Sequence, residues 1–156
     1  MRPTPAYNPW HHLQAHWPTA EVIIEPLPGD LLGVTRFPPL RISLSSHSSP
    51  AQQRCTLAHE IVHLERDPIS DDETDQPLVW SPREERRVHA LASARLIHAD
   101  ALVAAIRDLG GSDDRAALSA LLDVDAETLR VRLALLDPQE RAAIWQQVGT
   151  ELWAVA

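Results

Sequence analysis

The chain has 156 residues, of which 44% are hydrophobic and 23% are charged, as in an ordinary globular protein of one domain. Fourteen arginines and no lysine stand against 22 acidic residues, and the net charge of −8 has the wrong sign for direct nucleic acid binding. The single cysteine, Cys55, excludes a disulfide framework and a four-cysteine zinc module. Because the sequence also lacks a signal peptide and an apolar run of ~18 residues, we expect a cytoplasmic protein with no membrane segment.

The first 48 residues predict a short helix and a small antiparallel sheet. Asn8 and Pro9 are typical of an N-cap and of the first position of a helix. The histidines of that helix, at positions 11, 12 and 16, have no acidic neighbours in the sequence, so we interpret the segment as an amphipathic helix rather than a metal cluster. Residues 21–27 predict a strand, and residues 31–36 and 40–45 predict a hairpin around Phe37, Pro38 and Pro39.

The rest of the chain predicts helices. Ser49 and Ser81 are each followed by proline and, three residues on, by Gln52 or Glu84, which is the pattern of a helix start. An acidic loop is expected between the first two helices, and a solvated loop is its simplest interpretation. The predicted helices cover residues 49–66, 81–98, 101–109, 113–122 and 126–136 and the segment from 137 to the C-terminus, with the loop at 67–79.

The first long helix contains the sequence His-Glu-Ile-Val-His, beginning at His59. Positions i and i+4 lie one turn apart on the same face of a helix, so the imidazoles of His59 and His63 can reach one metal ion. Glu60 lies one residue along, close enough to act on a water at the metal. Unpaired histidines and a glutamate would be costly in so apolar a segment.

A catalytic Zn²⁺ needs a third protein ligand. Cys55 lies one turn before His59, but Cys55 and His63 are separated by ~12 Å along the helix, too far to share one ion, so we expect Cys55 to be a small buried apolar residue. The second helix offers Glu85 and, one turn later, His89.

Glu84 is expected to fold back onto the Ser81 amide, which leaves Glu85 available for the metal with His89 supporting a ligand. The reverse assignment, with His89 on the metal, and a surface ion pair for Glu85 remain as alternatives.

The stretch QQRCTLAHEIVHLERDP and the later REERRVHALASARLI resemble the ImmA/IrrE family of metallo-endopeptidases, most closely its short bacterial and phage members. The resemblance implies His59, His63 and Glu85 as zinc ligands and Glu60 as catalytic base. It departs from the family pattern at His89, where Asn or Asp is usual, at Leu91, where an aromatic is usual, and at His98, which replaces a frequent proline.

Together these observations predict an α+β fold, with a small N-terminal antiparallel sheet packed on a zincin-like helical core and a helical C-terminal cap. We expect one zinc metallopeptidase domain over residues 1–156, made of an N-terminal helix and sheet (1–48), two metal-site helices (49–98) and a cap (99–156). In this site Glu60 would take the proton of the attacking water and pass it to the leaving amine. Candidates for stabilising the oxyanion are His47, His89, Arg95 and His98.

The resemblance further implies a protein substrate, namely a helix-turn-helix repressor of a mobile element or stress response. The alternative is a non-hydrolytic, zinc-stabilised interaction protein that binds a regulator.

Residues 113–136 have helix-turn-helix spacing, but three arginines against six acids from Ser112 through Asp137 would repel DNA. We therefore interpret them as part of the helical cap, packed on the catalytic core through their leucines, at positions 118, 121, 122, 129, 133 and 136.

Overall fold

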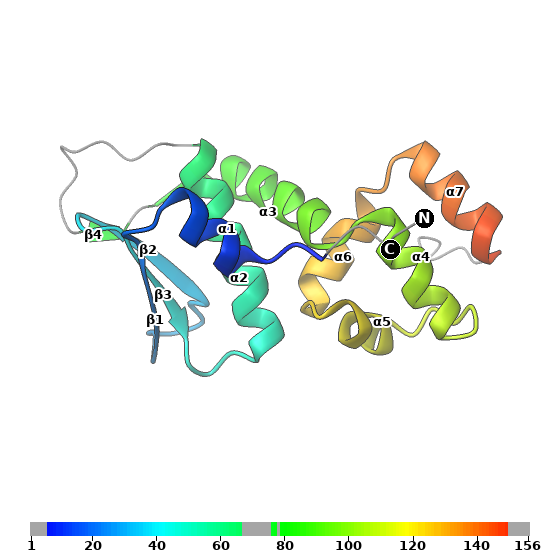
Figure 1. The fold of residues 1–156 in the computed structure, drawn as a ribbon, viewed down its shortest axis with the longest axis horizontal. Coiled ribbons are helices and arrows are strands. Elements are labelled where there is room, and N and C mark those ends of the chain that lie inside the picture. The colour runs from blue at the N-terminus through cyan, green and yellow to red at the C-terminus, as the bar shows by residue number, and fades with distance from the viewer. Residues whose placement is uncertain (1–5, 67–75, 78, 150–156) are drawn as a thin grey trace. The chain divides into compact units, whose positions relative to one another are not determined.

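The structure is a computed structural model that describes residues 6–66, 76–77 and 79–149 (Figure 1). The chain divides into two compact units, of which one runs from Tyr7 to Ala92 and the other begins at Ser93. A small sheet and seven helices in these described residues confirm the α+β class predicted from the sequence. The assignment of all 156 residues to one domain stays a prediction.

The sheet of the first unit has the strand order β1-β3-β2-β4. Its strands are β1 (Glu21–Glu25), β2 (Gly33–Phe37), β3 (Arg41–Ser45) and β4 (Gln76–Pro77). The predicted hairpin is confirmed, since β2 and β3 pair antiparallel with Thr35 opposite Ile42. β4 pairs with β2 within a segment for which the sequence predicted only a loop.

The prediction of an antiparallel sheet is wrong for β1, which pairs parallel with β3, so the sheet is mixed. The connection between β1 and β2 is too long for a tight hairpin, and it contains Pro26 and Pro28, which cannot donate to a strand partner. β3 therefore occupies the place between them. At its end the Ser45 amide donates to Leu32 and the Ser46 amide donates to Glu25, one bond toward each neighbour.

The core of the first unit lies between the sheet and α2 (Pro50–Arg66), with α1 (Pro9–His16) beside α2 (Figure 1). The predicted caps are present, because Asn8 accepts from the His11 amide and Ser49 accepts from the Gln52 amide. Apolar side chains from both helices and the sheet form one cluster, comprising Leu13, Leu40, Ile42, Leu44, Leu57, Ile61 and Leu64. These contacts fix how α2 is rotated against the strands.

One of the N-terminal histidines, His12, has an acidic partner from another helix. The His12 Nε2 atom lies 3.0 Å from Glu65 on α2, and the His12 ring contacts His16. Because Leu13 and Pro9 are buried while His11 and His16 are exposed, α1 is amphipathic as predicted. The His12–Glu65 pair helps attach this helix to α2.

Five helices follow β4 in the described residues, which end at position 149. They are α3 (Pro82–Leu96), α4 (Ala99–Asp108), α5 (Arg115–Leu122), α6 (Ala126–Ala134) and α7 (Pro138–Val148). α3 ends two residues before the predicted boundary, and His98 is the N-cap residue of α4. In the second unit α4 contacts α5 and α7, and α5 contacts α6. The turn between α5 and α6 contains Asp123 in the left-handed conformation, at φ 52°.

The leucines of residues 113–136 differ in how deeply they are buried. Leu118, Leu129, Leu133 and Leu136 are buried, as predicted, and Leu122 is half-buried. Leu121 is 51% exposed, which corrects its assignment to the core. It lies on the last turn of a helix of only eight residues, whose buried residue is Leu118. The packing of these helices on the metal-site helices stays a prediction.

A buried arginine organises the second unit. Arg132 donates from Nε to the Ile97 carbonyl at 2.8 Å and from its terminal nitrogens to both carboxylate oxygens of Glu140. Glu140 also accepts from the Asp137 amide in the capping box that begins α7. One ion pair thus holds α6, the end of α3 and the start of α7 together.

The acidic loop predicted at 67–79 falls mostly outside the described residues, as does the last part of the helix predicted to reach the C-terminus. In the described residues no single helix is long and apolar enough to cross a membrane. α3 and α4 pass that test as a bent pair, by length and composition only.

Replacing Glu140 by Gln should destabilise the folded protein by about 1.5–3 kcal/mol near pH 7, because it removes charged hydrogen bonds from a buried arginine. The hydrogen bonds from Arg132 hold the pKa of Glu140 below its ordinary value. The stabilisation is therefore complete above the pKa that Glu140 has in the unfolded chain. It is lost as the pH falls through the lower pKa that Glu140 has in the folded protein. Urea unfolding at several pH values measures it.

The matched control is Glu127→Gln, which removes the exposed ion pair to Arg130 on α6. This substitution should leave the unfolding midpoint nearly unchanged. Equal effects of the two substitutions, or a loss at Glu140 that persists at acid pH, would contradict the role assigned to the Arg132 pair.

Candidate metal centre

The candidate site begins with the rotation of α2. Leu57, Ile61 and Leu64 face the sheet, whereas Val62 packs against Val88 and Ala92 of α3. With 3.6 residues per turn, the side chains of Glu60, His63 and His59 follow one another around the helix between these two faces. The apolar packing therefore brings Glu60 closest to the sheet and turns the two histidines toward α3.

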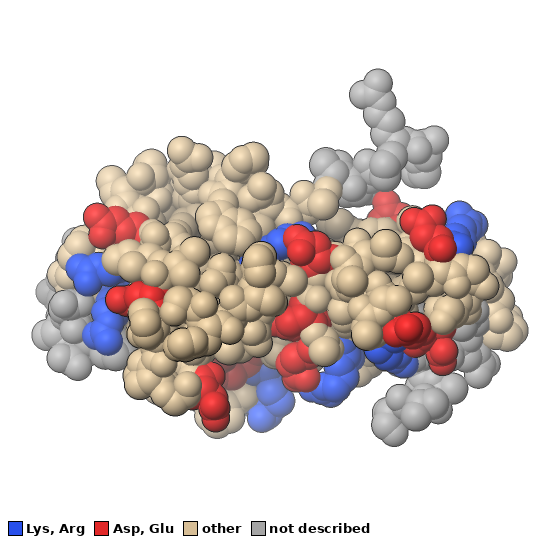
Figure 2. Space-filling model, turned by 90° about the horizontal axis from the view of Figure 1, so that it is seen from below, with Lys and Arg blue, Asp and Glu red and all other residues tan. Residues whose placement is uncertain are grey.

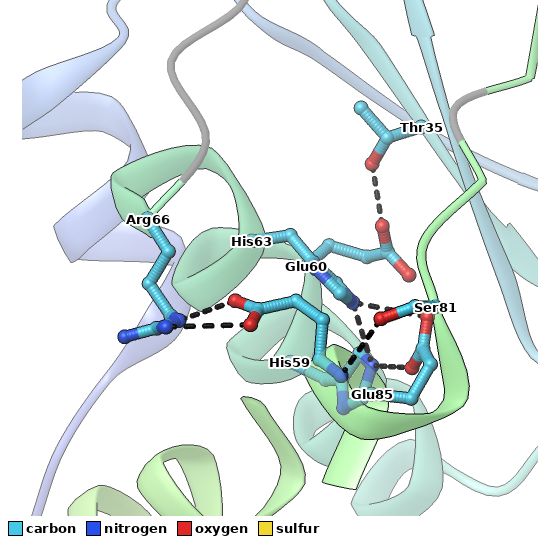
Figure 3. A network of polar contacts seen from close by, with 8 residues as sticks. Thr35, His59, Glu60, His63, Arg66, Ser81 and Glu85 are labelled. Carbon is cyan, nitrogen blue, oxygen red and sulfur yellow. Dashed lines mark hydrogen bonds and ion pairs between the residues drawn. The ribbon is translucent and has the colours of Figure 1, made fainter. Parts of the chain in front are cut away.

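Three side chains converge where α2 faces α3 (Figure 3). The His59 Nε2 atom lies 2.9 Å from Glu85 Oε2 and 3.1 Å from His63 Nε2, and His63 Nε2 lies 3.3 Å from Glu85 Oε1. All three ligand atoms lie within 4.8 Å of one another. His63 is 1% exposed and Glu85 is 43% exposed, so the group is buried on the α2 side and open at the carboxylate. Two imidazoles and a carboxylate are a donor set that Zn²⁺ accepts.

The start of α3 positions Glu85. Ser81 accepts from the Glu84 amide at 3.2 Å, as expected of an N-cap residue. The Glu84 carboxylate, however, is bound by Arg66 at the end of α2 rather than by the Ser81 amide, which corrects the predicted capping box. Charge attraction to the arginine of the neighbouring helix decides its position. The outcome for Glu85 is the expected one, because Glu84 is occupied and Glu85 points to the histidines.

His59 is held in its neutral form. Burial and the neighbouring His63 lower the pKa of His59 to about 4, despite the opposing effect of the Glu85 carboxylate. Neutral imidazole is the form that ligates a metal, and a carboxylate beside it supplies negative charge. Near neutral pH, the electrostatics of the group therefore suit a divalent cation.

Glu60 occupies the side of the site next to the sheet. It is 7% exposed, and its Oε2 atom accepts a hydrogen bond of 2.6 Å from the Thr35 hydroxyl of β2. Burial raises the pKa of Glu60 to about 7, although the bond from Thr35 acts in the opposite direction. A carboxyl group in this range can both accept and release a proton near neutral pH.

Two aromatic contacts support the histidines. The Trp80 ring stacks on His63 with centroids 3.7 Å apart and planes at 18°. His89, one turn after Glu85, meets the His59 ring nearly perpendicularly at 5.5 Å. The structure thus groups Glu85 with the histidine nitrogens and places the His89 ring in contact with the His59 ring. The supporting role of His89 stays a prediction.

Sequence reasoning missed Thr35 and Trp80. The hydrophobic staple joins an apolar residue before the N-cap to an apolar fourth residue of the helix, and that fourth residue is here Glu85, so the local sequence does not predict the contact of Trp80 with His63. Nothing in the local sequence distinguishes Thr35 from any threonine in a buried strand.

The remaining candidates lie outside the converging group. Cys55 is buried, as expected of a small apolar residue. Among the oxyanion candidates, His89 contacts a member of the group, His47 lies on the connection from β3 to α2, and Arg95 and His98 belong to the second unit. Their oxyanion roles stay predictions.

Comparison with known families gives one match. Residues 20–134, about three-quarters of the chain, match the sequence model of the peptidase M78 family, described as the IrrE N-terminal-like domain. No curated protein and no solved structure matches the chain. The matched segment contains His59, His63 and Glu85 and the side chains that contact them.

Glu85→Ala should weaken zinc binding by more than ~100-fold, because it removes one of three converging donors, whereas His89→Ala should weaken it by at most ~10-fold. Chelator competition and elemental analysis of the two purified variants measure the difference. Loss of zinc from His89→Ala with retention in Glu85→Ala would reverse the assignment.

Proposed function

The chain belongs to the peptidase M78 family with an IrrE N-terminal-like domain, and from that premise we propose that it is a zinc-dependent endopeptidase. The observation that carries the proposal is the convergence of His59, His63 and Glu85 beside the buried carboxyl group of Glu60. A metal site without an adjacent proton acceptor would be equally consistent with a metal that only stabilises the fold. Glu60 makes this one suited to hydrolysis.

The three donors fit Zn²⁺ by chemistry and by placement. His59 and His63 would provide two neutral nitrogens and Glu85 one carboxylate oxygen, which leaves a fourth position for the reacting groups. When bound, the ion supplies Lewis acidity, which polarises a carbonyl group and makes water more acidic.

The proton transfers of the reaction would be carried out by a residue of the chain itself. Glu60 would accept a proton from water as the water oxygen bonds to the carbonyl carbon of the scissile peptide. It would then deliver that proton to the amide nitrogen as the carbon–nitrogen bond breaks, so that an acid and an amine are released. Glu60 is largely shielded from bulk solvent, and the Trp80 ring stacks on the His63 ring.

We further propose a protein substrate, a helix-turn-helix repressor of a mobile element or stress response, cleaved in the cytoplasm. The sequence resemblance to the ImmA/IrrE metallo-endopeptidases supports this choice, and the net charge of −8 complements the basic surface with which such a repressor contacts DNA. On the face shown in Figure 2, arginines are interspersed with acidic residues rather than gathered into a broad basic surface. That distribution supports recognition of a protein without direct binding of nucleic acid.

Glu60→Gln should retain one zinc per chain but lose at least ~100-fold of the rate of repressor cleavage, because the proton acceptor is gone while the ligands remain. Mass spectrometry of a purified repressor incubated with each protein measures cleavage. Glu65→Gln is the matched control on the same helix, since Glu65 contacts His12 and should leave cleavage unchanged.

Hydrolysis would be contradicted if the repressor stayed intact after incubation with the wild-type protein and if the wild type and Glu60→Gln had equal biological effects. That result would favour the alternative of a zinc-stabilised protein that acts by binding a regulator.

A further inference from the structure

We propose that Thr35 and Gly33 of β2 are positioning residues for Glu60, which they hold so that its Oε1 atom is the oxygen that exchanges protons with the substrate. The inference rests on the proposed function in taking Glu60 as the base of a peptidase. Positions 33 and 35 are two residues apart on one strand and therefore point to the same face of the sheet, here the face that contacts α2.

Thr35 fixes one oxygen of the carboxyl group. Thr35 is 1% exposed, and its hydroxyl donates to Glu60 Oε2 at 2.6 Å, a short bond of the charge-assisted kind. A buried carboxylate without donors would be strongly destabilised, so this bond defines the rotation of the group. With Oε2 engaged, Oε1 is the oxygen available to take up a proton.

The bond from Thr35 reaches the Glu60 carboxyl group from the side of the sheet. In Figure 3 Thr35 lies on one side of the Glu60 carboxyl group, and the contact between His59 and Glu85 lies on the other. The hydroxyl thus holds Glu60 from the side of the sheet, away from the converging ligand atoms. This arrangement leaves the site side of the carboxyl group for the reactants.

Gly33 keeps the second oxygen uncovered. A methyl group at this position would lie 2.5 Å from the Thr56 Cγ2 atom and 3.5 Å from Glu60 Oε1. The first distance is a clash and the second is ordinary contact with the reactive oxygen. Glycine is therefore required by close approach of α2 to the strand, and its missing side chain leaves space next to Oε1.

The first test compares Thr35→Val, which keeps the shape and removes the hydroxyl, with Thr35→Ser, which keeps the hydroxyl. With zinc content unchanged, Thr35→Val should lower kcat for repressor cleavage by ~10–100-fold without changing KM, and Thr35→Ser should stay within about 3-fold of wild type. In a Glu60→Gln background, Thr35→Val should cause no further loss. Wild-type kcat in folded Thr35→Val would overturn the inference.

A second readout does not depend on activity. The carboxyl carbon resonance of Glu60, identified by its disappearance in Glu60→Gln, should shift in metal-free Thr35→Val and stay in place in Thr35→Ser. If the wild type cleaves nothing, the proposed function fails, whereas the resonance still decides whether Thr35 holds the carboxyl group. An unmoved resonance in Thr35→Val would overturn the positioning role.

A third variant keeps the inference testable if Thr35→Val does not fold. Thr56→Ser removes the carbon that a side chain at position 33 would strike and keeps the hydroxyl that donates to Gln52 at 2.8 Å. Adding Gly33→Ala to Thr56→Ser should therefore preserve zinc content and lower kcat at least ~10-fold relative to Thr56→Ser alone. In the metal-free protein the same addition should move the Glu60 resonance. Equal kcat and an unmoved resonance would overturn the role of Gly33.

Discussion

The candidate metal centre depends on how α2 is rotated between the sheet and α3. Apolar side chains fix that rotation on both sides, through Ile61 and its neighbours against the strands and through Val62 against α3. The residues between these faces have little freedom, because shifting the helix by one position would expose its apolar stripe. Burial of ordinary hydrophobic residues thus sets the positions of His59, His63 and Glu60.

The elements α3 and β2, on either side of α2, position different residues of the site. α3 brings the carboxylate of Glu85 to the histidines, and the Arg66–Glu84 ion pair ties the start of α3 to the end of α2. β2 brings a hydroxyl to Glu60 from the opposite direction. The proposed ligands and the proposed base are therefore supported by separate parts of the first unit. Substitutions in β2 can alter proton transfer while the ligands stay in place.

Much of this site could be predicted from the sequence, because its main signals are local. The spacing of His59 and His63 follows from helix geometry, and a helix that begins after Ser81 offers Glu85 and His89 one turn apart on one face. The capping box that was expected to set Glu84 aside did not form, because Arg66 of α2 binds the Glu84 carboxylate. The parallel pairing of β1 with β3 was not predictable, since it depends on which of two strands occupies the middle of the sheet. The bond from Thr35 to Glu60 joins residues 25 positions apart and has no local sequence signal.

The central claim is that two imidazoles and one carboxylate form the zinc-binding group. Zinc K-edge X-ray absorption of protein loaded with one equivalent of Zn²⁺ tests it directly. We expect nitrogen and oxygen neighbours at about 2.0–2.1 Å, the outer-shell pattern of two imidazole rings, and no sulfur at about 2.3 Å. A third imidazole would place His89 on the metal, and a sulfur neighbour would place Cys55 there; either result would contradict the assignment of His59, His63 and Glu85.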